Sequence, residues 1–330
     1  GVNSSCLQPL GGLWLLSILI GLVICGLILL IPNEWISGGL NIPNWLLSLG
    51  VFVILLGIVP GGGILGLEQY KAVTFFSLVS AVILILGVVS LTEESTSYDA
   101  ILFFILSMAV QSLGNSYIVF KRVGFEKLYN TRAINKKTPM FLASLMAASG
   151  SWLVGRIILS GDSGEYQFAL YAIGLQWFSL TLFMPGMVSR VVLPRLIRAE
   201  LSSGSDVKLT KQASLLTVGA AIFTVLVGAL VSPFLLRFYG DEYNVSYFFL
   251  VIFMVSAVPA SPANTLGNAI VSKNGQFQWL YLTTFWFVFL ITISMFFVGF
   301  GAIAGAISYT ISYTILAVLA LIVAKRMRLV

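Results

Sequence analysis

The sequence contains no histidine, only two cysteines and few charged residues. Charged residues make up 9% of its 330 positions, whereas a soluble domain carries about 25%. A chain so poor in charge cannot cover a water-facing surface. Two cysteines cannot form a disulfide framework, and the lack of histidine removes the commonest acid–base residue and metal ligand.

Long apolar runs take the place of charge. Hydrophobic residues make up 58% of the chain, and the mean hydropathy is +1.01. A run of about 20 apolar residues is long enough to cross a bilayer as a helix. Ten such runs predict spans at 11–31, 45–65, 72–91, 101–120, 139–160, 166–189, 213–236, 245–270, 277–298 and 302–324. The expected fold class is therefore an all-α polytopic membrane protein.

The charges between these runs are sorted by side. Sixteen of the eighteen basic residues lie on alternate connections, and only Arg156 and Arg237 lie elsewhere. The opposite connections carry acidic residues. Basic loops face the cytoplasm in membrane proteins, so both ends of this chain are expected on the cytoplasmic side.

Two segments of the chain repeat at a distance of about 200 residues. "GIVPGGGILG" (57–66) matches "SAVPASPANTLG" (256–267), and "VFKR" (119–122) matches "VAKR" (323–326). The offset pairs spans one to four with spans seven to ten and leaves spans five and six without partners. We therefore expect a fold of two six-helix bundles, related in parallel, that lacks its first two helices here.

This repeat predicts a division into three parts. Residues 1–120 form an N-terminal bundle of four spans, residues 121–138 a basic cytoplasmic linker, and residues 139–330 a C-terminal bundle of six spans. The linker is either a solvated loop or a helix on the membrane surface, and the loop is the favoured interpretation.

Two classes of function fit such a chain. One is a transporter or flippase, and the other is a membrane-embedded polymerase or ligase that acts on lipid-linked sugars. An enzyme needs an acid, a base or a nucleophile held at a site, and here no span contains paired carboxylates or a metal-ligand spacing. We therefore expect no enzyme activity, no cofactor, no metal and no nucleic-acid partner.

Two long segments resemble bacterial polysaccharide flippases of the O-antigen exporter type. "GEYQFALYAIGLQWFSLTLFMPGMVSRVVLPRL" (164–196) is similar to their eighth helix, which opens with Gly164 and Tyr166 and closes on Pro194 before Arg195. Residues 238–276 are similar to their tenth helix. These flippases belong to the superfamily that also contains multidrug extruders and the lipid II flippase.

The resemblance implies a pair of bundles that alternates between inward-open and outward-open states. It implies transport of an undecaprenyl-diphosphate-linked oligosaccharide across the bacterial inner membrane, with membrane lipids and the polysaccharide polymerase machinery as further partners. A multidrug extruder or lipid II flippase of the same fold is the alternative. No span centre carries the carboxylate that a cationic drug would need, which favours an anionic cargo.

Arg156 is the first candidate for cargo binding, because an arginine within a span usually faces an interior or a partner. Its planar guanidinium suits phosphate oxygens. It could also pair with Asp162 or Glu165 as an outer gate, or extend to the membrane surface.

Other polar residues at span level are also candidates. Gln176 and Trp177 suit sugar hydroxyls and sugar faces, although neighbours on a helix point in different directions. Asn264 and Asn268 share one helix face after two prolines, and they either bind cargo or link helices.

Three candidates lie near the cytoplasmic ends of spans. Arg190 and Arg195 are expected to meet the diphosphate, or else anionic lipid. Glu68 is the candidate for ion coupling, with a salt bridge to Lys71 as the simpler alternative.

Overall fold

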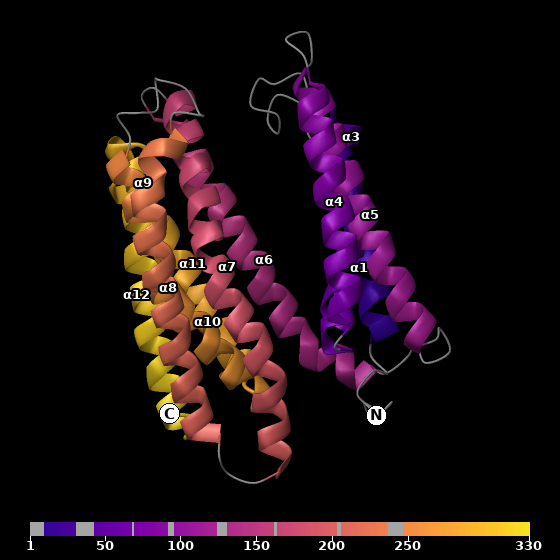
Figure 1. Cartoon of the computed structure of the whole chain (residues 1–330), viewed down its shortest axis with the longest axis vertical. Coiled ribbons are helices and arrows are strands. Elements are labelled where there is room, and N and C mark those ends of the chain that lie inside the picture. The colour runs from indigo at the N-terminus through magenta and orange to yellow at the C-terminus, as the bar shows by residue number, and fades with distance from the viewer. Residues whose placement is uncertain are drawn as a thin grey trace. The chain divides into compact units, whose positions relative to one another are not determined.

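The structure is a computed structural model of the whole chain (Figure 1). It describes residues 10–30, 43–67, 69–91, 96–123, 131–161, 164–202, 206–236 and 247–330. Contacts between residues divide the chain into two compact units, Gly1–Asn135 and Lys136–Val330. The division lies inside the segment predicted as a linker, and each unit is described separately below.

Helices account for almost all of the described chain. The first unit contains α1 (Leu10–Leu30), α3 (Asn44–Gly66), α4 (Tyr70–Ser90) and α5 (Ser97–Val123). The second contains α6 (Thr131–Leu159), which begins just before the division, α7 (Gly164–Ser202), α8 (Asp206–Leu236), α9 (Tyr247–Val255), α10 (Ala257–Ser272), α11 (Gln276–Phe296), the 3₁₀ turn η4 (Val298–Phe300) and α12 (Ala302–Arg326).

The membrane class expected from the sequence is confirmed. Nine spans in the described part of the chain are long and apolar enough to cross a bilayer, and α1 adds the shorter apolar stretch Ser17–Leu30. Three boundaries differ from the expectation. The span expected at 166–189 is part of the longer helix α7, the span expected at 245–270 is divided into α9 and α10, and the expected linker is partly helical, because α5 extends to Val123 and α6 begins at Thr131.

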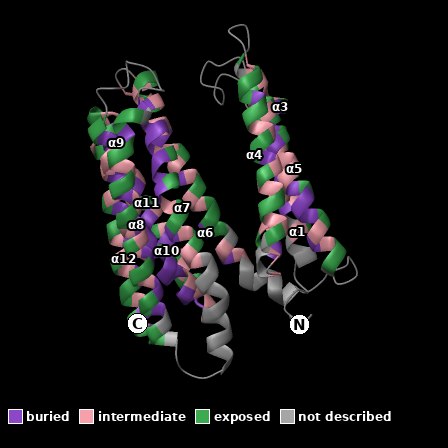
Figure 2. Cartoon of the chain, in the orientation of Figure 1, coloured by how far each residue is buried: buried purple, intermediate pink, exposed green. Residues whose placement is uncertain are grey.

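Many large apolar side chains are exposed along the helices, and Figure 2 shows in green how exposed residues run along them. Val89 and Leu230 each expose about three quarters of their surface, at 77% and 74%. Such side chains are costly in water but stable against lipid tails. The exposed apolar faces are therefore consistent with helices that lie in a membrane.

The helix packing repeats between the two units. In the first unit α3 contacts α1 and α5, and α4 contacts α5. In the second unit α9 and α10 contact α8 and α12, and α11 contacts α12. The four helices that follow the predicted repeat thus pack in the same order in both units, and α6 and α7 add to the second.

Hydroxyl groups link helices in both units, at the contact of α3 with α5 and at the contact of the α9–α10 junction with α12. In the first unit the Ser112 hydroxyl on α5 donates to the Val53 carbonyl on α3 at 3.0 Å. Gly57 allows this close approach, since a side chain there would overlap Ser112. In the second unit the hydroxyls of Ser256 and Thr310 are 2.7 Å apart, between the α9–α10 break and α12.

The core of the second unit is aromatic and centred on Ser151 of α6. The Tyr171 hydroxyl on α7 donates to the Ser151 carbonyl at 2.8 Å, and the Tyr309 hydroxyl on α12 donates to the Ser151 side chain at 2.5 Å. Phe178 and Phe253 pack against Tyr309 with ring centres 5.4 and 5.9 Å away. These contacts hold α6, α7, α9 and α12 together.

Prolines inside three helices each leave one backbone carbonyl without its usual donor, and a neighbouring helix supplies another. Pro60 in α3 frees the Leu56 carbonyl, which accepts from the Trp14 indole N–H at 3.1 Å. Such pairing is needed because an unsatisfied carbonyl in hydrocarbon costs several kcal/mol, on the order of 4.

The same arrangement occurs twice in the second unit. Pro185 in α7 frees the Thr181 carbonyl, which lies 3.0 Å from the Thr224 hydroxyl of α8. Pro233 in α8 frees the Ala229 carbonyl, which accepts from the Tyr247 hydroxyl of α9 at 3.3 Å. The Ala229 carbonyl also accepts from the Ser232 hydroxyl of α8 at 3.2 Å, and the Thr224 hydroxyl lies 3.0 Å from the Ala220 and Ala221 carbonyls as well, so local hydroxyls share in both arrangements.

Where two prolines follow each other closely, the regular helix is interrupted at a single residue, Ser256, which keeps helical dihedral angles of φ −58° and ψ −23°. Pro259 and Pro262 remove two N–H donors within one turn of the sequence "SAVPASPANTLG". α9 ends at Val255 and α10 begins at Ala257. The interruption lies on the N-terminal side of both prolines, because a proline removes the hydrogen bond to the preceding turn.

We predict that the Trp14→Phe variant loses stability only when Pro60 is present. Loss of the indole N–H leaves the Leu56 carbonyl unsatisfied, which costs about 1–3 kcal/mol. In a Pro60→Ala background the new backbone N–H takes that carbonyl, so Trp14→Phe should cost much less. The measurement is a double-mutant cycle on thermal unfolding in lipid nanodiscs.

Trp45→Phe is the control for this cycle, because Trp45 is 51% exposed and its indole donates to no carbonyl of the described residues. An equal cost of Trp14→Phe in both backgrounds would show that the indole contributes packing alone.

Candidate functional site

One face of α7 carries two neighbouring cavities. Leu175, Ser179, Leu182, Gly186 and Ser189 are spaced by four and three residues, so they share one side of the helix. All five line one cavity or the other. This side of α7 therefore faces both cavities.

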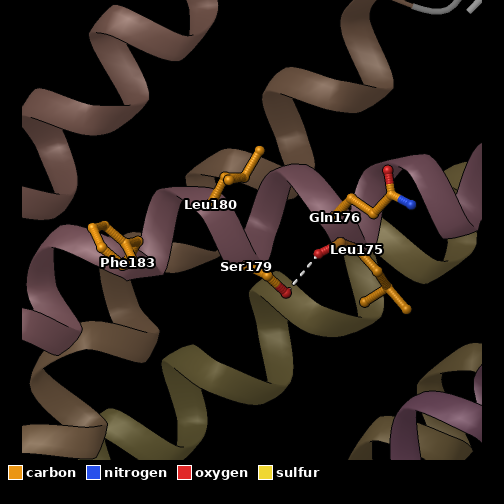
Figure 3. Close-up of a pocket in the computed structure, with 5 residues that line it drawn as sticks. All are labelled: Leu175, Gln176, Ser179, Leu180 and Phe183. Atoms are coloured by element: carbon orange, nitrogen blue, oxygen red, sulfur yellow. Dashed lines mark hydrogen bonds between the residues drawn. The ribbon is translucent and has the colours of Figure 1, made fainter. Parts of the chain in front are cut away.

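The first cavity is an open hollow along α7, and Leu180 and Phe183 beside it are more than half exposed (Figure 3). It is lined by Leu175, Gln176, Ser179, Leu180 and Phe183, all from α7. The Ser179 hydroxyl donates to the Leu175 carbonyl at 2.8 Å. Gln176, one of the candidates from the sequence, is exposed and brings its amide to this cavity.

Trp177 does not accompany Gln176 into this cavity. Its side chain is only 7% exposed and lies in the core of the second unit, where its indole nitrogen is buried. Adjacent residues on a helix point about 100° apart, so only one of the two could face the cavity. The structure thus gives Trp177 a packing position, and we leave it out of the site.

The second cavity lies between three helices and has a volume of about 380 Å³. Its lining combines amides, hydroxyls and one indole with a few apolar groups, from Leu182, Pro185, Gly186, Ser189, Ser261, Asn264, Asn268 and Trp279. The candidates Asn264 and Asn268 therefore lie together, on the α10 face that Ser261 extends. We name this cavity the amide pocket.

A chain of hydroxyls supports the amide pocket from behind. Thr265 of α10 lies 3.1 Å from the Ser189 hydroxyl of α7 and 3.1 Å from the Thr217 hydroxyl of α8. Thr217 and Thr265 are almost fully buried. This chain fixes α7, α8 and α10 against one another, so the pocket has a rigid wall.

The indole of Trp279 closes another side of the amide pocket. It packs on Gly267 of α10 so closely that a β-carbon there would lie 2.5 Å from the ring. Glycine is therefore required at this position for α11 to bring Trp279 to the pocket. The indole is half-buried and presents part of its surface to the cavity.

Arg156 lies apart from both cavities, in the last turn of α6. Its side chain is half-buried, and its guanidinium lies 5.9 Å from the ring centre of Trp152, one turn earlier. This cation–π contact orients the guanidinium and reduces its cost at the end of a span. Asp162, an expected partner, lies outside the described residues.

The remaining candidates cannot be placed by their side chains. Arg190 and Arg195 lie on α7 beyond the amide pocket, but only the helix itself is described there. Glu68 lies outside the described residues. Ser189, Ser261 and Trp279 were missed by sequence reasoning. The regular spacing on α7 could have pointed to Ser189, whereas no local signal marks Trp279.

The chemistry of these cavities is neutral hydrogen bonding beside an aromatic surface. Within the described part of the chain, no three His, Cys, Asp or Glu side chains gather to hold a metal ion. The described side chains that line the two cavities include amides and hydroxyls but no charged group. Such a surface can bind and orient a polar, uncharged group.

Comparison with known proteins identifies the fold. No protein-family model matches the chain, and no curated protein is similar to it in sequence. Among solved structures, an outward-facing multidrug resistance MATE family transporter of the MOP superfamily aligns with a TM-score of 0.71 at 17% identity, over 98% of this chain and 78% of that one.

An inward-facing MATE family transporter aligns with a TM-score of 0.70 at 18% identity, over 96% of this chain and 79% of that one. A MOP superfamily transporter from Pyrococcus furiosus, described by the reverse polarity of its binding pocket, aligns with a TM-score of 0.66 at 17% identity, over 98% and 78%. The expectation of an all-helical exporter fold is confirmed at this level, and the chain has the fold of the MOP superfamily transporters.

Proposed function

We propose that this protein is a flippase that moves an undecaprenyl-diphosphate-linked oligosaccharide from the cytoplasmic to the periplasmic leaflet of a bacterial inner membrane. The two units would act as bundles that expose the cargo to one side and then to the other. Both ends of the chain would lie in the cytoplasm, as the basic ends of α5 and α12 suggest. A polysaccharide polymerase would receive the product.

The observation that carries this proposal is the polarity of α7 and its surroundings. Both cavities on α7 offer neutral hydrogen-bonding groups, which suit sugar hydroxyls. Further along the same helix come Arg190 and Arg195, the latter about 9 Å beyond Ser189 at 1.5 Å per residue. A cargo with neutral sugars and a diphosphate matches this order of groups along α7, with neutral hydrogen-bonding residues first and the two arginines after them.

The placement of acidic residues supports an anionic cargo. Every carboxylate in the sequence lies outside the predicted spans. Asp99, one of those described, is engaged at the start of α5, where it accepts from the backbone N–H and hydroxyl of Thr96. A diphosphate would meet little repulsion in such a protein, whereas a cation would find no buried partner.

Export of cationic drugs is the second candidate, because solved multidrug resistance transporters share the fold. The missing carboxylates separate the two candidates, since a lipophilic cation in a membrane interior needs an opposite charge or an aromatic surface. The neutral lining of both cavities favours the oligosaccharide.

We predict that Arg156 is required for export. In a strain without its own exporter, the wild-type gene should restore surface polysaccharide. Arg156→Lys should restore it weakly, and Arg156→Ala should reduce it about tenfold to a hundredfold, the effect of losing a charged hydrogen bond. The measurement is surface polysaccharide at matched protein levels.

Lys121→Ala is the matched control for Arg156. Lys121 also stacks on an aromatic ring one turn earlier, with its nitrogen 5.5 Å from the ring centre of Tyr117, but it lies in the last turn of α5. If Arg156→Ala exports as well as the wild type, the arginine serves only to reach the membrane surface.

We also predict that the protein gives no resistance to cationic dyes. Expression in a strain stripped of its drug exporters should leave the inhibitory concentration of ethidium unchanged, because the spans offer no carboxylate. A solved multidrug transporter of this fold is the positive control. Raised resistance, together with failure to restore polysaccharide, would favour the drug exporter.

A further inference from the structure

We propose that the amide pocket is a saccharide subsite that binds one pyranose ring of the cargo, with Trp279 as its stacking surface. The proposal rests on the proposed function for its cargo, but the site is argued from the pocket itself. The volume of about 380 Å³ lies near the lower end of the range for small-molecule sites, about 300–1,000 Å³. The pocket therefore suits a sugar-sized group.

The state of the two asparagines points to a ligand. Within the described part of the chain neither Asn264 nor Asn268 has a hydrogen-bond partner, and Asn264 is exposed and Asn268 half-buried, so both amides are open to the pocket although they lie inside a predicted span. Asn264 is about 12 Å, or eight residues, from the end of α10. Unpaired amides at this depth are costly unless water or a polar ligand reaches them.

Hydrogen-bonding capacity in the pocket matches a sugar. Each amide offers two donor hydrogens and one acceptor oxygen. The Ser189 hydroxyl is shared with Thr265, and the Ser261 hydroxyl donates to the Ala257 carbonyl at 2.6 Å, so both keep acceptor capacity toward the cavity. Donors and acceptors close together can bind vicinal hydroxyl groups, which need both.

The indole distinguishes a sugar from other polar groups. A pyranose has one face of C–H groups, which packs on a flat apolar ring, while its hydroxyls point sideways to hydrogen-bonding partners. Trp279 on α11 and the amides on α10 line the same pocket. No charged side chain is among the described residues of the lining, so neither a phosphate nor a cation would find an opposite charge there.

The test is direct binding of a neutral sugar to the full chain in lipid nanodiscs, since maltoside detergents carry a sugar of their own. The probe is N,N′-diacetylchitobiose, followed by saturation-transfer NMR and titration. We expect saturable binding, with transfer concentrated on the C–H protons of one ring face. Inorganic pyrophosphate, the second probe, should not compete.

Variants assign the binding to the pocket. Asn264→Ala and Asn268→Ala should each weaken the affinity by about threefold to tenfold, the effect of one hydrogen bond. Trp279→Ala should weaken it by about tenfold or more and abolish the transfer to the ring face, whereas Trp279→Phe should retain part of both. Gln278→Ala is the control, because Gln278 adjoins Trp279, is exposed and does not line the pocket.

Thermal unfolding of each variant separates lost binding from lost folding, and Trp279→Phe remains informative if Trp279→Ala fails to fold. The proposal is overturned if the wild type does not bind the disaccharide, if pyrophosphate displaces it, or if the pocket variants bind as the wild type does.

The export assay distinguishes a failure of the saccharide subsite from a failure of the proposed flippase function. Pocket-dependent sugar binding without restored polysaccharide would overturn the flippase and leave the subsite in place. Restored polysaccharide that is unaffected by the pocket variants, with no sugar binding, would overturn the subsite alone.

Discussion

The satisfaction of backbone carbonyls in a medium without water is the constraint on which the other features of this fold depend. A membrane helix normally meets it internally, but this chain places prolines inside its helices. Each of the freed carbonyls of Leu56, Thr181 and Ala229 lies within hydrogen-bond distance of a side chain of a neighbouring helix. A proline in one helix thus exposes a carbonyl that a side chain of a neighbouring helix can contact.

The same constraint explains the division between α9 and α10. One proline can be accommodated by one external donor, as at Pro60, and α3 continues through it. Two prolines within four residues remove two donors, and the regular helix is interrupted at Ser256, whose hydroxyl lies 2.7 Å from that of Thr310 on α12. Asn264 and Asn268 follow on the face of α10 that lines the amide pocket together with α7.

Much of the fold followed from the sequence because membrane helices depend on length and hydropathy, which are local. The pairing of Asn264 with Asn268 also followed, since four residues make nearly one helical turn. What could not be predicted depends on packing between distant helices. Trp279 enters the amide pocket only because Gly267, on another helix, leaves room for it, and Trp177 is buried because α7 turns that side to the core.

The pairing of a proline with a donor on another helix has a consequence for how such a protein can change over evolutionary time. While Pro60 persists, loss of the Trp14 indole N–H leaves the Leu56 carbonyl without a donor, whereas loss of the proline makes the indole N–H dispensable. Descendants of this chain that keep Pro60 should therefore also keep Trp14, 46 residues away in the sequence. Prolines in its relatives would then record which helices touch, so a set of related sequences could reveal the contacts of the bundle without a structure.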